Sequence, residues 1–116
     1  MNKMKVKASE LQGEALDRAV AHCVEWSKKF PIFTDEEPMS KGNYSTDWAL
    51  AGPIIERERI ATWFERYEDE DAGLPCWFAA KYGEREYPGP TPLIAAMRCY
   101  VASKLGDEVE VPDEIL

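Results

Sequence analysis

The chain opens with a period-two pattern of apolar and polar residues and continues with a helical one. Over residues 3–8, lysines alternate with Met4, Val6 and Ala8, which predicts a short, half-exposed strand whose lysines protect an edge. Over residues 13–26, apolar side chains recur at intervals of three and four, which predicts an amphipathic helix. These apolar positions are Leu16, Ala19, Val20, Cys23 and Val24.

The second half of the chain predicts a hairpin followed by a helix. Residues 60–67 and the sequence CWFAAKY at residues 76–82 are rich in aromatic residues and flank an acidic link with Gly and Pro, which is typical of paired antiparallel strands. Thr91 and Pro92 then supply an N-cap and a first-turn proline for a helix with a wide apolar stripe, which ends at Gly106.

The order strand, helix, loop, helix, strand, strand, helix predicts one α+β domain covering residues 1–116. In this domain, helices pack on a small, mainly antiparallel sheet in an α-β-α sandwich-like arrangement. Residues 28–43 lack periodic apolar positions and predict a long connection. Residues 68–71 and the C-terminal residues 107–116 are acidic, and they predict a solvated loop and tail or, alternatively, a surface that mimics DNA or docks on a partner.

The segment YSTDWALAGPIIERER, residues 44–59, combines helix signals with a helix breaker. Ser45, Thr46 and Asp47 are good N-capping residues, whereas Gly52 and Pro53 interrupt the pattern, because an internal proline costs a helix about 3 kcal/mol. We therefore expect a short first turn, a break or kink at Gly52 and Pro53, and a restarted helix over residues 54–59. Such a kink leaves backbone N–H groups accessible.

Two helix starts are candidates for a ligand site. Helix N-termini carry unpaired N–H groups and partial positive charge, so they bind phosphates and carboxylates even in an acidic protein. The alternative is that both starts are ordinary caps. The candidate residues are Tyr44, Ser45, Thr46, Asp47, Trp48, Pro90 and Thr91.

Charged residues extend this candidate site. Arg98 lies close to the apolar face of the last helix, where it either pairs with a carboxylate such as Glu56 or Asp47 or holds a ligand phosphate. Arg57 lies in the run ERER at residues 56–59, which is either a solvated helical face with internal ion pairs or a recognition surface. The aromatic residues, Trp48 among them, are either core residues or stack on a planar ring of a ligand.

Composition narrows the function. Fourteen Lys and Arg against 22 Asp and Glu give a net charge of −8, which disfavours binding to duplex DNA or RNA. The sequence shows no signal-peptide pattern and no apolar run long enough to span a bilayer. Three widely spaced cysteines predict neither a disulfide framework nor a metal site. Together these features predict a cytoplasmic monomer or small oligomer.

Catalytic patterns are sparse. His22 is the sole histidine and has no motif partner, so we expect a satisfied or exposed helical histidine rather than a general base. Cys99 has apolar neighbours and no evident base. The sequence contains no P-loop, GxGxxG, HExxH or zinc-binding spacing, which favours binding over turnover and gives no indication of a cofactor or metal.

Three segments resemble the NinX-like family of small proteins of tailed bacteriophages. They are VKASELQGEALDRAVA, YSTDWALAGPIIERE and GPTPLIAAMRCYVASKLGDEVEVP, which together touch both ends and the centre of the chain. The chain departs from the family pattern at residues 49–51, where a more polar, glycine-rich run is expected. GEALD, YSTD and the late helix are also similar, more weakly, to phage domains described as alpha-beta-alpha sandwiches.

The resemblance implies an accessory protein made in the cytoplasm of an infected bacterium. Small acidic phage proteins of this type commonly counter host defences, by docking on a host protein or by sequestering a nucleotide signal. The leading hypothesis is therefore a non-enzymatic protein that sequesters a small nucleotide-like ligand, such as a host immune signal. The alternatives are an acidic inhibitor that binds a host protein and, third, a hydrolase of nucleotide signals.

Overall fold

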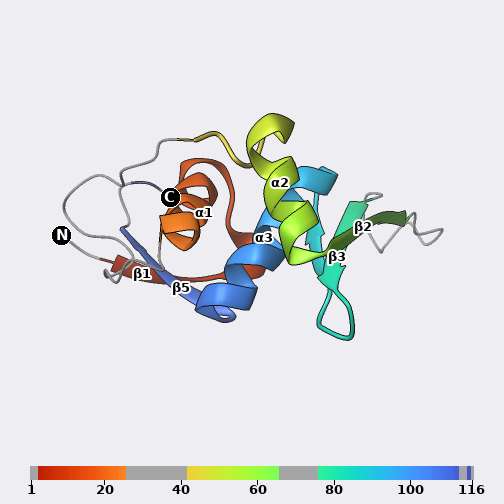
Figure 1. Cartoon of the computed structure of the whole chain (residues 1–116). Coiled ribbons are helices and arrows are strands. Elements are labelled where there is room, and N and C mark those ends of the chain that lie inside the picture. Colours follow the sequence, from red (N-terminus) through yellow and green to blue (C-terminus); the bar gives the residue numbers. More distant parts are fainter. Residues whose placement is uncertain (1–2, 26–41, 66–75, 113–114, 116) are drawn as a thin grey trace.

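A computed structural model describes residues 3–25, 42–65, 76–112 and 115 of the chain (Figure 1). The elements in chain order are β1 (Lys3–Lys7), a short 3-10 helix η1 (Ala8–Glu10), α1 (Gly13–Glu25), α2 (Trp48–Glu58), β2 (Ile60–Glu65), β3 (Cys76–Lys81), β4 (Tyr87–Gly89), α3 (Pro92–Leu105) and β5 (Glu108–Pro112). The described part of the chain thus holds three α-helices and two small antiparallel sheets, which confirms the α+β class.

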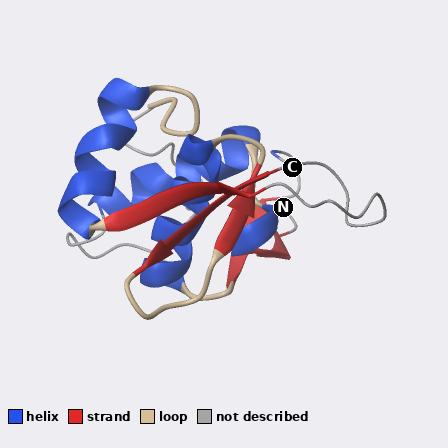
Figure 2. Ribbon diagram, turned by 90° about the vertical axis from the view of Figure 1, so that its right-hand side faces the viewer, coloured by secondary structure: helices blue, strands red, loops and turns tan. Residues whose placement is uncertain are grey.

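The strands form two sheets instead of the single sheet that the sequence predicted. β1 pairs with β5, while β2, β3 and β4 form a second antiparallel sheet in that order. The β2–β3 hairpin is the one predicted, and Trp63 lies opposite Phe78 in it. The two sheets lie on opposite sides of α3 in Figure 1, to its left and right, and Figure 2 shows the strands against the helices. α3 contacts strands of both sheets and joins them into one body.

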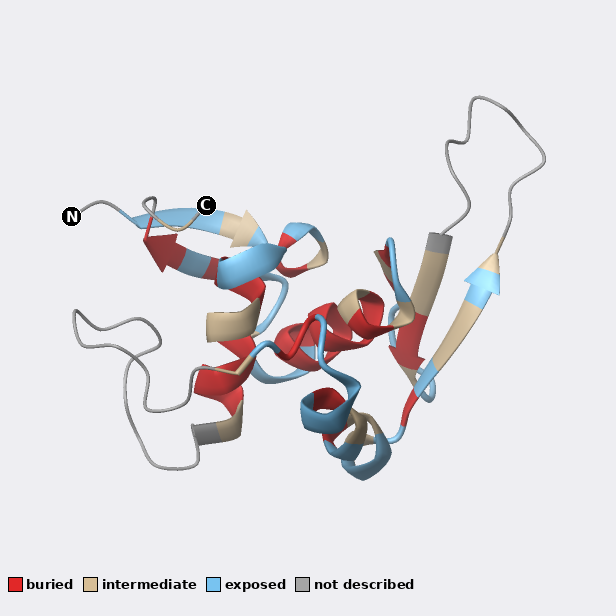
Figure 3. Ribbon diagram, turned by 90° about the horizontal axis from the view of Figure 1, so that it is seen from above, coloured by how far each residue is buried: buried red, intermediate tan, exposed pale blue. Residues whose placement is uncertain are grey.

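The core surrounds α3. Residues 95–102 of this helix are all buried, which Figure 3 shows as a continuous red ribbon at the centre of the molecule. A helix buried on nearly every side is typical of a central element. The predicted apolar face of α1 packs toward it, and Leu16 and Val20 are fully buried.

α2 runs through Pro53 as one continuous helix, so the break and restart predicted there are wrong. Pro53 cannot donate to the carbonyl of Ala49, but both residues are exposed, so water can bond that carbonyl. Ala51 and Ile54 are buried on the other side of the helix. Burial of an isoleucine side chain contributes about 1.5–3 kcal/mol, which offsets the cost of the proline. The accessible N–H groups expected at a break are therefore not created.

Residues 108–112 form β5, so the prediction of a solvated tail is wrong for this segment. Val109 and Val111 are buried while Glu110 is exposed, a period-two alternation. Glu110 lies opposite Lys5 of β1, and opposite charges across a strand pair are favourable. The pairing with β1 thus explains both the acidic residues of this segment and the predicted lysine-rich strand.

Some predictions fall outside the described residues. These are the long connection at residues 28–43 up to residue 41, the acidic run at residues 68–71, and the end of the strand predicted to reach residue 67. In the ranges that are described, no helix has the length and apolar character needed to cross a membrane.

Candidate functional site

The two predicted helix starts are capped by their own side chains. Asp47 precedes α2, and its Oδ1 accepts a hydrogen bond from the N–H of Ala49 at 2.8 Å. Thr91 precedes α3, next to the exposed Pro90, and its Oγ1 accepts from the N–H of Ile94 at 3.1 Å. Each side chain satisfies an amide that would otherwise be open to a ligand. Both capping hydrogen bonds lie within their own helix start.

The segment that leads into α2 is tied to α1. Ser45 is buried, and its N–H donates to Oδ1 of Asp17 on α1 at 2.7 Å. Tyr44 is also buried, whereas Thr46 is exposed. Trp48, in the first turn of α2, is 56% exposed. Among the aromatic candidates of this segment, Trp48 is therefore the one whose ring is accessible for stacking.

Arg98 is buried and bound by backbone carbonyls. Its Nε donates to the carbonyl oxygen of Leu11 at 2.7 Å, and its Nη1 donates to that of Pro88 at 2.9 Å. The predicted pairing with Glu56 or Asp47 is wrong, because the guanidinium donates to these two carbonyl oxygens instead. Burial lowers the pKa of Arg98. Arg98 thus ties the segment before α1 to β4, and two of its N–H groups are committed to that role.

Arg57 belongs to a charged cluster, the Glu58 cluster, made of Arg57, Glu58, Lys81 and Lys104. Oε1 of Glu58 accepts a hydrogen bond from Nζ of Lys81 at 2.9 Å and lies 3.4 Å from Nζ of Lys104. Oε2 accepts from Nε of Arg57 at 3.2 Å. These side chains come from the end of α2, the end of β3 and the last turn of α3. Three elements that are distant in sequence therefore bring three cations to one carboxylate.

The electrostatics of the Glu58 cluster follow from this crowding of cations. Burial by itself would raise the pKa of Glu58, but hydrogen bonds from Lys81 and Arg57 and the charges of Lys81 and Lys104 outweigh it and lower the pKa to about 2. Glu58 is therefore ionised at neutral pH. One carboxylate against three cations leaves the cluster with a net charge of +2 in a protein of net charge −8.

Tyr100 contacts two cations of the Glu58 cluster. Nη2 of Arg57 donates to its hydroxyl oxygen at 3.4 Å, and Nζ of Lys104 lies 5.9 Å from the centre of its ring, within the range of a cation–π contact. Burial raises the pKa of Tyr100 to about 12, so the phenol stays neutral. The side chains of Arg57 and Lys104 remain 55% and 42% exposed, so an anion in solution can reach them.

Glu58→Gln is expected to lower the free energy of unfolding at pH 7 by about 1–3 kcal/mol, because it leaves three cations without their counter-charge. Urea unfolding measures this loss. The pKa of Glu58 is lower in the folded state than in the unfolded state, so its stabilisation is present above pH 4.5 and disappears as the pH falls toward 2. The difference between the two proteins should shrink over this window, and a pH-independent difference would contradict the assignment.

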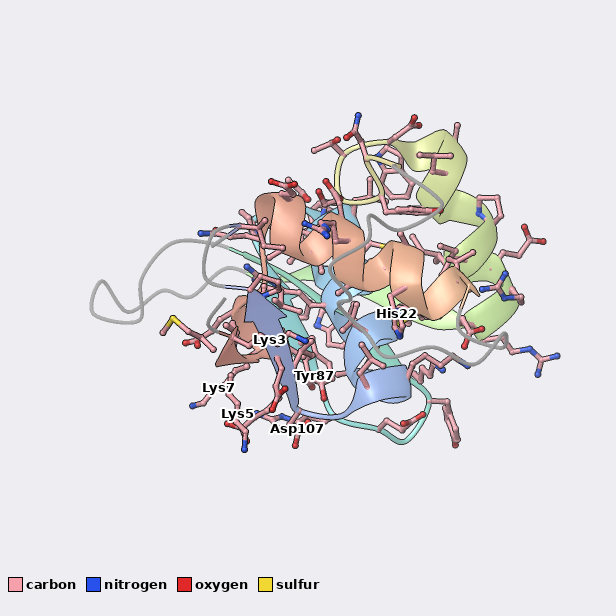
Figure 4. All side chains as sticks on the ribbon, turned by 90° about the vertical axis from the view of Figure 1, so that its left-hand side faces the viewer. Lys3, Lys5, Lys7, His22, Tyr87 and Asp107 are labelled. Atoms are coloured by element: carbon pink, nitrogen blue, oxygen red, sulfur yellow. The ribbon has the colours of Figure 1, made fainter. Side chains whose placement is uncertain are left out.

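His22 is buried on α1 (Figure 4), and among the described residues its Nε2 has no hydrogen-bond partner. The expectation of a satisfied or exposed histidine is therefore wrong. His22 lies beside the apolar stripe of α1, and it is buried together with its neighbours Ala21 and Cys23. Desolvation lowers the pKa of His22, which favours the neutral ring in the folded protein.

Acidification below pH 6.5 should lower the melting temperature, in part through His22. The unfolded chain takes up a proton near the ordinary histidine pKa of 6.5, whereas the folded chain does so only at lower pH. Stability contributed in this way is present above pH 6.5 and is lost as the pH falls toward the lower pKa of the folded state. His22→Leu removes this term, so its melting temperature should fall less between pH 7 and pH 5.5. Parallel curves for the two proteins would show that His22 does not titrate as described.

The described cysteines do not resemble nucleophiles. Burial raises the pKa of Cys23 to about 12 and also raises the pKa of Cys99, so both are protonated thiols at neutral pH. Across the described ranges, no group of three His, Cys, Asp or Glu side chains is arranged to hold a metal ion. The Glu58 cluster, by contrast, gathers three cations at one carboxylate, and such a set of side chains favours anions.

Comparison with known families places the chain. The model of the family described as Bacteriophage P22, NinX matches residues 7–104. The chain belongs to the NinX family. The matched range includes every residue of the Glu58 cluster and both helix starts, whereas β5 and nearly all of β1 lie outside it. No curated protein matches this NinX-family chain.

Proposed function

We propose that this NinX-family protein binds a small nucleotide-like ligand, with the Glu58 cluster holding its phosphate. The observation that supports the proposal is the meeting of Arg57, Lys81 and Lys104 at one carboxylate in an otherwise acidic protein. Lysine and arginine are the side chains that bind phosphate oxygens, as point charge and as fork respectively. The proposal keeps Arg57 from the sequence-based site and replaces Arg98 with the two lysines.

In the proposed binding step, the phosphate of the ligand takes the place of the Glu58 carboxylate at some of the cations of the cluster. A phosphate group carries between one and two negative charges at neutral pH, which matches the net charge of +2. Arg57 and Lys104 are the more exposed cations, so they meet the ligand first, while Lys81 stays with Glu58. Because Glu58 competes for the same cations, its removal should strengthen anion binding even as it weakens the fold.

Isothermal titration calorimetry tests the proposal with ADP-ribose, a cyclic dinucleotide, inorganic pyrophosphate and adenosine. We expect heat from the phosphate-bearing nucleotides and none from adenosine. Lys104→Gln should weaken binding, Glu58→Gln should strengthen it, and Lys5→Gln is the matched control, because it removes the same charge from the exposed face of β1. Binding should also weaken with added salt.

Two results would overturn specific binding at the Glu58 cluster, and a third would overturn the nucleotide as its ligand. One is the absence of heat with every phosphate-bearing compound. The other is an equal effect of Lys104→Gln and Lys5→Gln, which would reduce the binding to a general charge effect. Pyrophosphate binding as tight as nucleotide binding would assign the cluster to phosphate alone and remove the nucleotide from the proposal.

The biological role that we propose for this binding is sequestration, in which the ligand is held without being broken down. A protein that holds a host nucleotide signal lowers its free concentration in the cytoplasm of the infected cell and so counters host defence. Chromatography of the ligand recovered after incubation distinguishes this role from hydrolysis. Intact ligand would support sequestration, whereas breakdown products would support the hypothesis that the protein is a hydrolase.

A second candidate function, inhibition of a host protein, is favoured by the exposed first turn of α2. Trp48 and Leu50 are 56% and 39% exposed beside the carboxylate of Asp47. Tryptophan contributes strongly to protein interfaces, and an acidic protein favours a basic partner. Under this alternative, Trp48→Ala abolishes capture of a basic host protein, while Lys104→Gln leaves the capture unchanged.

A further inference from the structure

In the part of the chain that the structure describes, no strand pairs with the outer edge of β2. β2 is the outermost strand of its sheet and pairs with β3 on one side only (Figure 3). Within the described ranges, no backbone hydrogen bond reaches its other side. A strand edge with unpaired N–H and C=O groups is a template for pairing with another strand.

The other edge strands that the structure describes, β1, β4 and β5, carry protection that β2 lacks. β4, at the opposite edge of the same sheet, has three residues, includes Pro88 and lies against α3. β1 and β5 carry alternating lysines and glutamates on their exposed face. β2, by contrast, has six residues, with the sequence IATWFE, and holds neither proline nor lysine. Phe64 on this strand is 50% exposed.

We propose that β2 pairs with β2 of a second copy of this chain, in antiparallel register about a two-fold axis at Trp63. This register places Trp63 opposite its symmetry mate, Thr62 opposite Phe64, and Ala61 opposite Glu65. All three pairs keep side chains of the same face together, because alternate residues of a strand point to the same side. The product is one six-stranded sheet that runs through both copies.

Charge supports a second copy as the partner in this register. Glu65 is the only charged residue of β2, and it meets Ala61 rather than its own symmetry mate. The two Glu65 positions lie four residues apart along the paired strands, about 13 Å, which exceeds the screening length at physiological salt. Ile60, which is buried where β2 follows α2, is left out of the pairing. The interface is therefore self-complementary without like charges face to face.

The pairing also covers aromatic surface. Trp63 stacks on Phe78 with 6.0 Å between ring centres, and Phe64 packs against Trp77 at 5.2 Å, so aromatic pairs lie on both faces of the hairpin. In the proposed register, each pair continues into the second copy, through Trp63 on one face and through Thr62 beside Phe64 on the other. Cross-strand aromatic pairs stabilise such sheets.

Sedimentation of the full chain over a range of concentrations tests the proposal, with two charge variants at the exposed Ala61. Ala61→Lys faces Glu65 of the second copy and should strengthen dimerisation, whereas Ala61→Glu should weaken it, by on the order of tenfold between the two variants. Ala49→Lys and Ala49→Glu at an exposed position of α2 are the matched controls and should not differ. Wild-type association should strengthen with salt, which screens the net charge of −8 on each copy.

Hydrogen exchange supplies a measurement that needs no variant. Amides of β2 should gain protection as the protein concentration rises, while those of β4 should not. A wild-type chain that stays monomeric at every concentration overturns the proposal. Dimers in which the two Ala61 variants behave alike overturn the register and with it the β2 interface. Neither result bears on nucleotide binding at the Glu58 cluster, because Lys81 and Lys104 are not part of this edge.

Discussion

Gly89→Ala is expected to lower the free energy of unfolding by about 2–3 kcal/mol, the cost of forcing extra atoms into a packed interior. A Cβ added to Gly89 would lie 2.5 Å from the backbone nitrogen of Ala95 and 2.9 Å from its Cα. These are backbone atoms of α3, so no side-chain rotation relieves the clash. Either β4 alone or the whole β2–β3–β4 sheet must move away from α3. Urea unfolding of the variant measures the loss.

Gly52→Ala is the matched control for Gly89→Ala. Gly52 lies inside α2, and a Cβ there would meet nothing within 4 Å. Because alanine favours the helix over glycine, the same substitution at this position should stabilise the protein by about 0.5–1 kcal/mol. Opposite signs for the two variants support the close packing of β4 on α3. Two losses of equal size would contradict it.

Arg98→Met should destabilise the protein by about 2–4 kcal/mol. Methionine fills much of the buried volume, but it leaves the carbonyl oxygens of Leu11 and Pro88 without their donors, and burying an unpaired polar group is costly. Arg98→Lys keeps the charge and has one amine for two acceptors that differ in direction, so an intermediate loss is expected. Urea unfolding at pH 7 ranks the three proteins.

Arg85→Met separates the role of Arg98 from the general loss of a positive charge. Arg85 is exposed, and its Nη1 lies 3.4 Å from a carboxylate oxygen of Asp107. Exposed ion pairs contribute between about 0 and 1 kcal/mol, so this variant should be nearly as stable as wild type. A loss at Arg98 no larger than the loss at Arg85 would show that the two backbone hydrogen bonds do not hold the fold together.

These scaffold contacts bear on the proposed site through α3. The first turns of α3 pack against Gly89, and Arg98 lies near the middle of the helix. Further along the same helix, Tyr100 and Lys104 contact the Glu58 cluster. A shift of β4 or of the segment before α1 would therefore displace the lysine that we place against a phosphate. Variants of Gly89 or Arg98 are for this reason poor tests of ligand binding, and Lys104→Gln is the better one.

The sequence by itself determined the elements whose signals are local. The apolar spacing of α1, the Thr91 cap and Gly106 end of α3, and the alternation in β1 and β2 depend on neighbouring residues, and the structure has these elements. The resemblance to NinX proteins rested on the same local segments, and the family match over residues 7–104 confirms it. Local patterns suffice there because capping and periodicity act within a few residues.

Tertiary structure decided what depends on distant partners. The acidic residues 108–112 became a strand because β1 lies beside them, and Pro53 was tolerated because its side of α2 faces solvent. Lys81 lies 23 residues from Glu58 in the chain, and neither it nor Lys104 carries a local signal of the cluster. Arg98 donates to two backbone carbonyl oxygens, and no pattern in the sequence marks a backbone carbonyl as the partner of a distant side chain. The energy of such contacts arises only when the chain has folded, so a pattern read along the sequence cannot contain it.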